Sequence, residues 1–197
     1  KYWYYGMPGV APGTRVVQGH ELSGVVEDTG GDVRDKSIVG ARVAVDPSLW
    51  CGVCDMCNAG MSNLCRNLRF MSLPPVDGGY QQFYKVPERN IHPTPNDIPA
   101  EWSSMTEPVS ISINAISNAE RIIDTLSDKT IAVVGAGPQG LLLMQTAQVI
   151  SKPRQIYVLE PLQYRRELAE ELGASATIDP QAGDPLERIM DITSGMG

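Results

Sequence analysis

Hydrophobic positions are spaced as in β-strands through the first 114 residues of the chain. Short β-branched runs at 24–26 and 41–45 are separated by glycine pairs and Asp-rich turns, a pattern typical of strands and their connections. The run at 79–86 predicts a further strand, and the proline-dense segment 87–99 is expected to be loop and edge strand. We therefore expect residues 1–114 to form a β-rich lobe.

The spacing changes after residue 108. Val109, Ile113, Ile116 and Ile122 recur near helical spacing, which predicts a linking helix over 108–123. Short apolar runs and helical segments then alternate. Strands are predicted at 131–134, 156–159 and 176–178, and helices at 141–150, 162–172 and 185–192. Three such βα units form one half of a doubly wound parallel sheet, in spatial order 3-2-1, so residues 115–197 are expected to be an α/β domain.

The first of these strands runs directly into a glycine-rich turn. Gly135 permits the tight turn from strand to helix, Gly137 lets a pyrophosphate approach the backbone, and Gly140 lets the helix pack close to the strand. Pro138 and Gln139 complete the turn at the start of the helix, whose free N–H groups attract phosphate. This arrangement predicts a dinucleotide-binding loop; the alternative is a structural turn that binds nothing.

Glu160 stands at the end of the second predicted strand, twenty residues after Gly140. A carboxylate there accepts hydrogen bonds from both adenosine ribose hydroxyls and repels a 2′-phosphate, so NAD is favoured over NADP.

Composition and charge exclude some classes of binding partner. The 197 residues carry a net charge of −7 and a pI near 4.8, which argues against nucleic acid or an anionic membrane surface as a partner. No apolar run approaches the roughly 20 residues that a membrane-spanning helix needs. Residue 1 is Lys rather than Met, and no fourth strand follows the third βα unit, so the chain is expected to be cut at both ends.

All four cysteines lie between Cys51 and Cys65. The spacing Cys51-x2-Cys54-x2-Cys57-x7-Cys65 suits four thiolates around one tetrahedral zinc ion, with no open coordination position. Disulfides at such short spacing would form strained rings, which leaves free thiols or a redox site as the alternatives. The clustering also favours a reducing compartment, and we expect a cytoplasmic protein.

Taken together, these motifs resemble the zinc-dependent medium-chain alcohol dehydrogenases. The resemblance rests on Gly19-His20-Glu21, the cysteine loop, Glu107-Pro108, and the 135–140 turn with Glu160, all in the order found in that family. It implies a GroES-like β lobe followed by the first half of a Rossmann domain. The stretch that begins Glu107-Pro108-Val109-Ser110 is most similar to the polyol (sorbitol-type) and threonine dehydrogenase branches.

The resemblance also implies roles for individual residues. His20 would be a catalytic-zinc ligand, Glu107 a third ligand acting directly or through water, and Glu21 a neighbouring or alternate carboxylate that orients the site. The family's first zinc ligand, a cysteine, and its proton-relaying Ser or Thr would precede Lys1.

The expected activity is transfer of a hydride from a secondary alcohol, a polyol or a threonine-like compound, to NAD, with zinc as Lewis acid, in a homodimer or homotetramer. Two alternatives remain at this point. One is a zinc-free reductase of the quinone-oxidoreductase type on the same fold, and the other is a catalytically incomplete fragment that keeps only the structural zinc.

Overall fold

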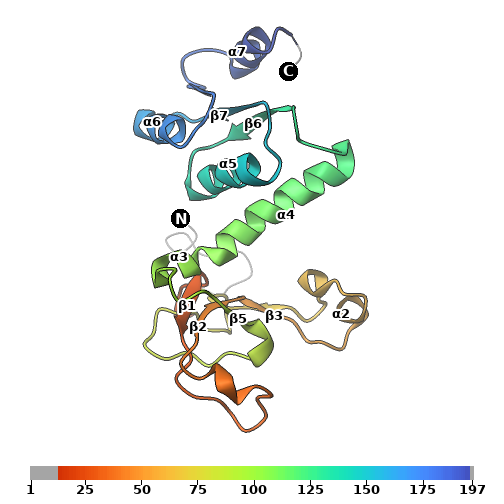
Figure 1. The fold of residues 1–197 in the computed structure, drawn as a ribbon, viewed down its shortest axis with the longest axis vertical. Coiled ribbons are helices and arrows are strands. Elements are labelled where there is room, and N and C mark those ends of the chain that lie inside the picture. Colours follow the sequence, from red (N-terminus) through yellow and green to blue (C-terminus); the bar gives the residue numbers. More distant parts are fainter. Residues whose placement is uncertain (1–12, 196–197) are drawn as a thin grey trace. The chain divides into compact units, whose positions relative to one another are not determined.

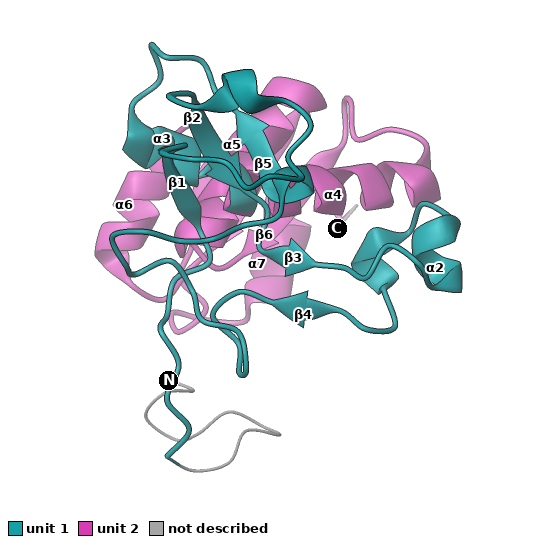
Figure 2. Cartoon of the chain, turned by 90° about the horizontal axis from the view of Figure 1, so that it is seen from below, with its two compact units in different colours: residues 1–107 teal, residues 108–197 magenta. Residues whose placement is uncertain are grey.

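The computed structural model describes residues 13–195 and divides the chain into two compact units, residues 1–107 and residues 108–197 (Figure 2). We call them unit 1 and unit 2. The boundary expected after residue 114 falls inside helix α4 (Thr106–Ile123), most of which belongs to unit 2.

Unit 1 is built on a small antiparallel sheet (Figure 1). Its strands β1 (Leu22–Val25), β2 (Arg42–Val45) and β5 (Ile91–Pro93) lie in the order β1-β2-β5. Val43 and Ala44 of the central strand are almost fully buried, and since neighbouring residues of a strand face opposite sides, β2 is covered on both faces. A second, two-stranded sheet pairs β3 (Ser48–Leu49) with β4 (Arg69–Phe70).

Short helical turns connect these strands. They are η1 (Lys36–Ile38), α2 (Asp55–Asn58), η2 (Ser62–Leu64) and η3 (Glu88–Asn90), and a further short helix, α3 (Ala100–Ser104), follows β5. The strand β5 lies at the edge of its sheet, as the proline-rich composition of this segment predicts, because Pro93 has no N–H to donate to a further neighbour.

The strand predicted at 79–86 is wrong, because this segment forms bends. The N–H groups of Gly78, Gly79 and Tyr80 donate to carbonyls in the segment 17–19. The pairing then stops, and the side chain of Gln81 folds back onto the carbonyl of Gly78. Hydrogen bonds from Gly78 and Gly79 to a segment about 60 residues earlier thus replace the regular strand pairing that the apolar pattern predicts.

Unit 2 begins with most of α4 and continues as three βα units. Its strands are β6 (Thr130–Val134), β7 (Gln155–Leu159) and β8 (Ala176–Ile178), and its other helices are α5 (Pro138–Ile150), α6 (Gln163–Glu171) and α7 (Pro185–Ile192). The strands are parallel and lie in the order β6-β7-β8, which confirms the predicted half of a doubly wound sheet.

The core of unit 2 lies between this sheet and its helices. Met144 of α5 and Ala169 of α6 are fully buried, and Val158 of β7 is 1% exposed. Ile116 of α4 joins the same cluster, so α4 packs on this core through its middle turns. No helix among residues 13–195 is long and apolar enough to cross a membrane.

Candidate metal centres and nucleotide site

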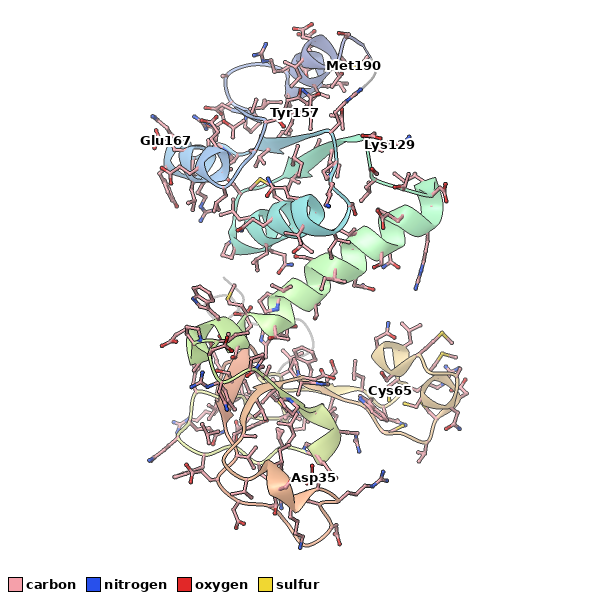
Figure 3. All side chains as sticks on the ribbon, in the orientation of Figure 1. Asp35, Cys65, Lys129, Tyr157, Glu167 and Met190 are labelled. Atoms are coloured by element: carbon pink, nitrogen blue, oxygen red, sulfur yellow. The ribbon has the colours of Figure 1, made fainter. Side chains whose placement is uncertain are left out.

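The four cysteines converge in the loop that contains α2 and η2, where Figure 3 labels Cys65. Their sulfur atoms all lie within 4.8 Å of one another. The Sγ atom of Cys54 is 3.5 Å from that of Cys57 and 4.0 Å from that of Cys65, and the Sγ atoms of Cys51 and Cys57 are 4.0 Å apart. Four sulfurs at tetrahedral zinc–thiolate distances would be about 3.8 Å apart. The donor set therefore fits one zinc ion.

Contacts outside the sulfur cluster hold this loop in shape. Arg66 forms a two-pronged ion pair with Asp55, with both N–O distances at 2.6 Å. At the start of the loop, Arg89 lies over the ring of Trp50 at 4.5 Å and donates a hydrogen bond to its carbonyl. These contacts orient the two ends of the loop, so that its cysteines are brought together by the protein itself.

The thiols of the cluster differ in acidity. The backbone N–H groups of Val53 and Cys54 lower the pKa of the Cys51 thiol to about 6, because they stabilise its thiolate. Desolvation raises the pKa of the Cys57 thiol to about 12. A thiolate cluster of this kind is stabilised by a cation at its centre, since the cation offsets both the desolvation and the mutual repulsion.

A second group of metal-binding side chains lies in unit 1. His20, Glu21 and Glu107 each present a ligand atom within 4.8 Å of the others. Bound to zinc, nitrogen and oxygen donors would be about 3.4 Å apart, which lies within the observed limit of 4.8 Å. Three protein donors with an open fourth position are typical of catalytic zinc sites. Glu21, expected to orient the site, therefore stands among the potential ligands.

Two features of unit 1 position His20. It lies two residues before the start of β1 and directly follows Gly19, whose φ of +93° is in the left-handed region. A Cβ atom at Gly19 would come within 2.6 Å of the Tyr80 ring, so this position needs glycine for its conformation and for the close approach. On its other side, the imidazole packs edge-on against Phe70, with ring centroids 5.4 Å apart.

The charge around Glu107 is predominantly negative. Burial raises the pKa of its carboxyl above the ordinary value, His20 lowers it, and the nearby carboxylates of Glu21 and Asp46 raise it. Like charges gathered around one partly buried carboxyl favour a bound cation. The sequence motifs did not predict a role for Asp46. A carboxylate placed directly after the buried strand β2 is the sequence feature that indicates one.

The glycine turn of unit 2 has the backbone that dinucleotide binding requires. Gly135 has a φ of +99°, and a Cβ atom at Gly140 would collide with the carbonyl oxygen of Gly135. Around Gly137 a Cβ would meet only the tip of Arg165, at 4.0 Å, so the backbone is accessible there. Helix α5 begins at Pro138, directly after this open backbone. The geometry allows a phosphate to approach the helix N-terminus.

Glu160 follows β7 and turns its carboxylate toward that loop. It is 4% exposed, and its two oxygens accept hydrogen bonds from the N–H groups of Ala136, at 2.8 Å, and Leu162, at 3.0 Å. These bonds, the first being the stronger influence, lower the pKa of Glu160, and Arg165 adds to the effect. An ionised carboxylate accepts about four hydrogen bonds in all. Acceptor capacity for ribose hydroxyls therefore remains.

The side chain of Gln139 forms hydrogen bonds with other residues of unit 2. Its Nε2 donates to the carbonyl of Pro108 and to the hydroxyl of Ser112, both at 3.0 Å. The sequence motif indicated a role for this residue in the loop, but no sequence signal pointed to these partners.

Comparison with known proteins agrees with this arrangement. Residues 1–96 match the family described as the alcohol dehydrogenase GroES-like domain. The chain is 35% identical over 182 residues to sorbitol dehydrogenase of Bacillus subtilis, and 33% identical over 181 residues to L-threonine 3-dehydrogenase of Pyrococcus horikoshii. Each match covers 92% of the chain and 50% of the relative. The chain thus spans about half the length of these curated relatives.

Solved structures show the same likeness. An alcohol dehydrogenase from Escherichia coli CFT073, solved with NADH, is 30% identical with a TM-score of 0.80, and the match covers 90% of this chain and 50% of that one. A zinc-binding dehydrogenase from Sinorhizobium meliloti, solved with NADP, is 35% identical with a TM-score of 0.78, and the match covers 87% and 48% of the two chains. The resemblance inferred from the motifs is therefore confirmed.

Proposed function

We propose that the chain is part of an NAD-dependent secondary-alcohol dehydrogenase. Residues 1–96 match the alcohol dehydrogenase GroES-like domain, and the likeness to sorbitol dehydrogenase extends over 92% of the chain. The observation that carries the proposal is the convergence of His20, Glu21 and Glu107, together with the 135–140 loop and Glu160 on the same chain. This combination supports metal-assisted hydride transfer to a nicotinamide cofactor.

Each group of residues has a role in this proposal. His20, Glu21 and Glu107 hold a catalytic zinc, and the four cysteines hold a structural one. When bound, the catalytic zinc supplies Lewis acidity toward the alcohol oxygen and NAD accepts the hydride. The edge-on contact of the His20 ring with Phe70 supports the imidazole from a side chain outside the donor set.

Glu160 and the glycine loop bind the cofactor. The open backbone at Gly137 and the N-terminus of α5 receive the pyrophosphate, and Glu160 accepts from the ribose hydroxyls. We expect NAD rather than NADP, because a 2′-phosphate would approach the negative charge of Glu160. Solved relatives have been seen with each of the two cofactors, so the preference is specific to this carboxylate and its surroundings.

The substrate proposed is a polyol, with a threonine-like compound as the second choice. A shallow, open depression of about 300 Å³ includes Glu21 in its lining, which is about equally polar and apolar and offers the carboxylate of Glu101 and the hydroxyl of Ser104. Carboxylates and hydroxyls are partners for a hydroxyl-rich substrate. The names of the relatives, sorbitol dehydrogenase and L-threonine 3-dehydrogenase, point to the same two classes.

Metal counting tests the proposal directly. We expect the protein of which this chain is part to hold two zinc ions, one of which is lost in Glu107→Ala, while Glu27→Ala, an exposed glutamate in the same unit, keeps both. NADH formation from sorbitol, xylitol or L-threonine should disappear on zinc removal and return with zinc. A count of one zinc, with turnover independent of metal, would reject the proposal in favour of the zinc-free reductase.

We also propose a cytoplasmic homodimer or homotetramer. The support for the compartment is the cysteine cluster, whose thiols must stay reduced to bind zinc. Light scattering of the purified protein tests the assembly, and fractionation of the source cells tests the location.

A further inference from the structure

Gln139 is the second residue of α5, and its side chain links the start of that helix to the start of α4. Its Nε2 lies 3.0 Å from the carbonyl oxygen of Pro108 and 3.0 Å from the hydroxyl of Ser112. Pro108 is buried, Ser112 is fully buried, and 31 residues separate Gln139 from Pro108. This contact therefore joins two helix beginnings that are distant in the sequence.

The orientation of the amide is determined by its partners. The Pro108 carbonyl can only accept, so the nitrogen, not the oxygen, of the Gln139 amide must face it. The amide nitrogen has two protons, and the two acceptors use both. Ser112 in turn donates to the same Pro108 carbonyl, at 3.4 Å, so the three groups form a closed network.

Each end of this network touches a site described above. Gln139 belongs to the 135–140 loop, and Pro108 directly follows Glu107, whose carboxylate lies with His20 and Glu21. One side chain therefore links the α5 N-terminus directly to the first turn of α4 by hydrogen bonds.

We propose that Gln139 is a positioning residue that couples NAD binding at the 135–140 loop to zinc binding at His20, Glu21 and Glu107. The inference rests on the proposed function for the identity of the two ligands. A cofactor bound to the loop holds the start of α5 in place, Gln139 transmits this to the first turn of α4, and Glu107 is held in the geometry that binds metal. The first ligand to bind bears the entropic cost of ordering the two helix starts. The second ligand then binds without that cost and therefore binds more tightly, which is positive coupling.

The coupling is measurable as a ratio of affinities. The chain is first loaded with one equivalent of zinc, which the four cysteines hold, and further zinc is titrated against a fluorescent chelator with and without saturating NADH. We expect NADH to tighten the second zinc by about fivefold or more. Zinc should tighten NADH by the same factor, because coupling between two binding sites is reciprocal. His20→Ala should abolish this second binding event, which identifies its location.

The decisive variant is Gln139→Met, which keeps the length of the side chain and removes both donors. The coupling factor should fall to about one. Because Gln139 belongs to the cofactor loop, this factor is taken as the ratio of the NADH affinities of the same variant with and without the second zinc, so that a change in basal affinity cancels. Gln145→Met is the matched control: Gln145 lies in the same helix, but its amide donates to Leu141 within that helix. This control should keep the coupling of the unaltered chain.

A second variant and a second measurement guard against an indirect effect. Ser112→Ala removes one of the two acceptors of Gln139 and should lower the coupling factor to an intermediate value. Amide hydrogen exchange should show that NADH protects the first turn of α4 in the unaltered chain and in Gln145→Met, but not in Gln139→Met.

The outcomes separate this inference from the function on which it rests. If NADH and the second zinc both bind but do so independently, or if Gln139→Met keeps the coupling, the role of Gln139 is refuted and the proposed function stands. If the protein of which this chain is part binds no NADH, or no second zinc, the proposed function fails and the coupling fails with it.

Discussion

The carboxylate of Glu160 accepts a hydrogen bond from the backbone N–H of Ala136 at 2.8 Å, which ties the end of β7 to the glycine turn that follows β6. The same side chain accepts from Leu162, where the chain turns toward α6. One buried carboxylate thus fixes two of the loops at the carboxyl edge of the parallel sheet. Ligands bind at this edge in open α/β sheets.

Glu160→Gln is expected to destabilise the protein by about 1.5–3 kcal/mol near neutral pH, because hydrogen bonds to a buried charged acceptor are lost. The folded pKa of Glu160 is lowered, so its contribution to stability is complete above the unfolded value of about 4.3 and is lost as the pH falls through the folded value. Thermal unfolding should show a constant difference between the two proteins from about pH 5 to 8 that shrinks on further acidification. A difference that grows toward acid pH would contradict this assignment.

Gly140→Ala is expected to weaken NADH binding by about tenfold or more, since a displacement of the loop by an ångström costs binding on that scale. The added methyl group would collide with the carbonyl of Gly135, which is backbone and cannot rotate away. Fluorescence titration with NADH provides the measurement. In the control Gly183→Ala the new methyl meets no atom within 4 Å, and binding should not change.

Gly19→Ala is expected to lower the occupancy of the second zinc without affecting the cysteine-bound one. A methyl group there would push the Tyr80 ring away and strain a backbone with a φ of +93°, so His20 would shift from the two carboxylates. Zinc counting by elemental analysis should give about one ion per chain in place of two. Gly24→Ala, in β1, meets nothing within 4 Å and should keep both.

Alkylation of the metal-free protein should distinguish the four cysteines. At pH 7.5 we expect Cys51 to react with iodoacetamide first, because its pKa of about 6 makes it a thiolate, and Cys57 last, because its pKa is raised to about 12. Peptide mapping by mass spectrometry gives the order. Zinc should protect all four, and denaturation should remove the difference between Cys51 and Cys57; equal rates in the folded protein would contradict the assigned acidities.

Local sequence patterns predicted much of this structure. The three βα units of unit 2 and the glycine turn follow from apolar periodicity and from glycines within a few residues of each other, and the predicted order of β6, β7 and β8 is confirmed. The four cysteines converge because their short spacing leaves few other arrangements.

Contacts between distant segments could not be predicted in the same way. The pairing of Gly78 and Gly79 with residues 17–19 replaced an expected strand, and nothing in an apolar run signals such a partner. The bond from Gln139 to Pro108 spans 31 residues, and the influence of Asp46 on Glu107 likewise depends on tertiary structure. Sequence identified the residue types of the candidate site, while the network that supports them came from the fold.

The division between the two units falls between Glu107 and Pro108, inside the continuous helix α4. Expression of one unit alone therefore requires either a cut within α4 or the assignment of the whole helix to one of the two pieces. A cut ahead of α4 leaves the N-terminal piece with His20 and Glu21 but without the third donor, and the C-terminal piece carries Glu107 away from its partners. All three donors of the candidate metal site lie in unit 1, so a cut after α4 keeps His20, Glu21 and Glu107 on one polypeptide, whereas a cut ahead of that helix separates Glu107 from the other two.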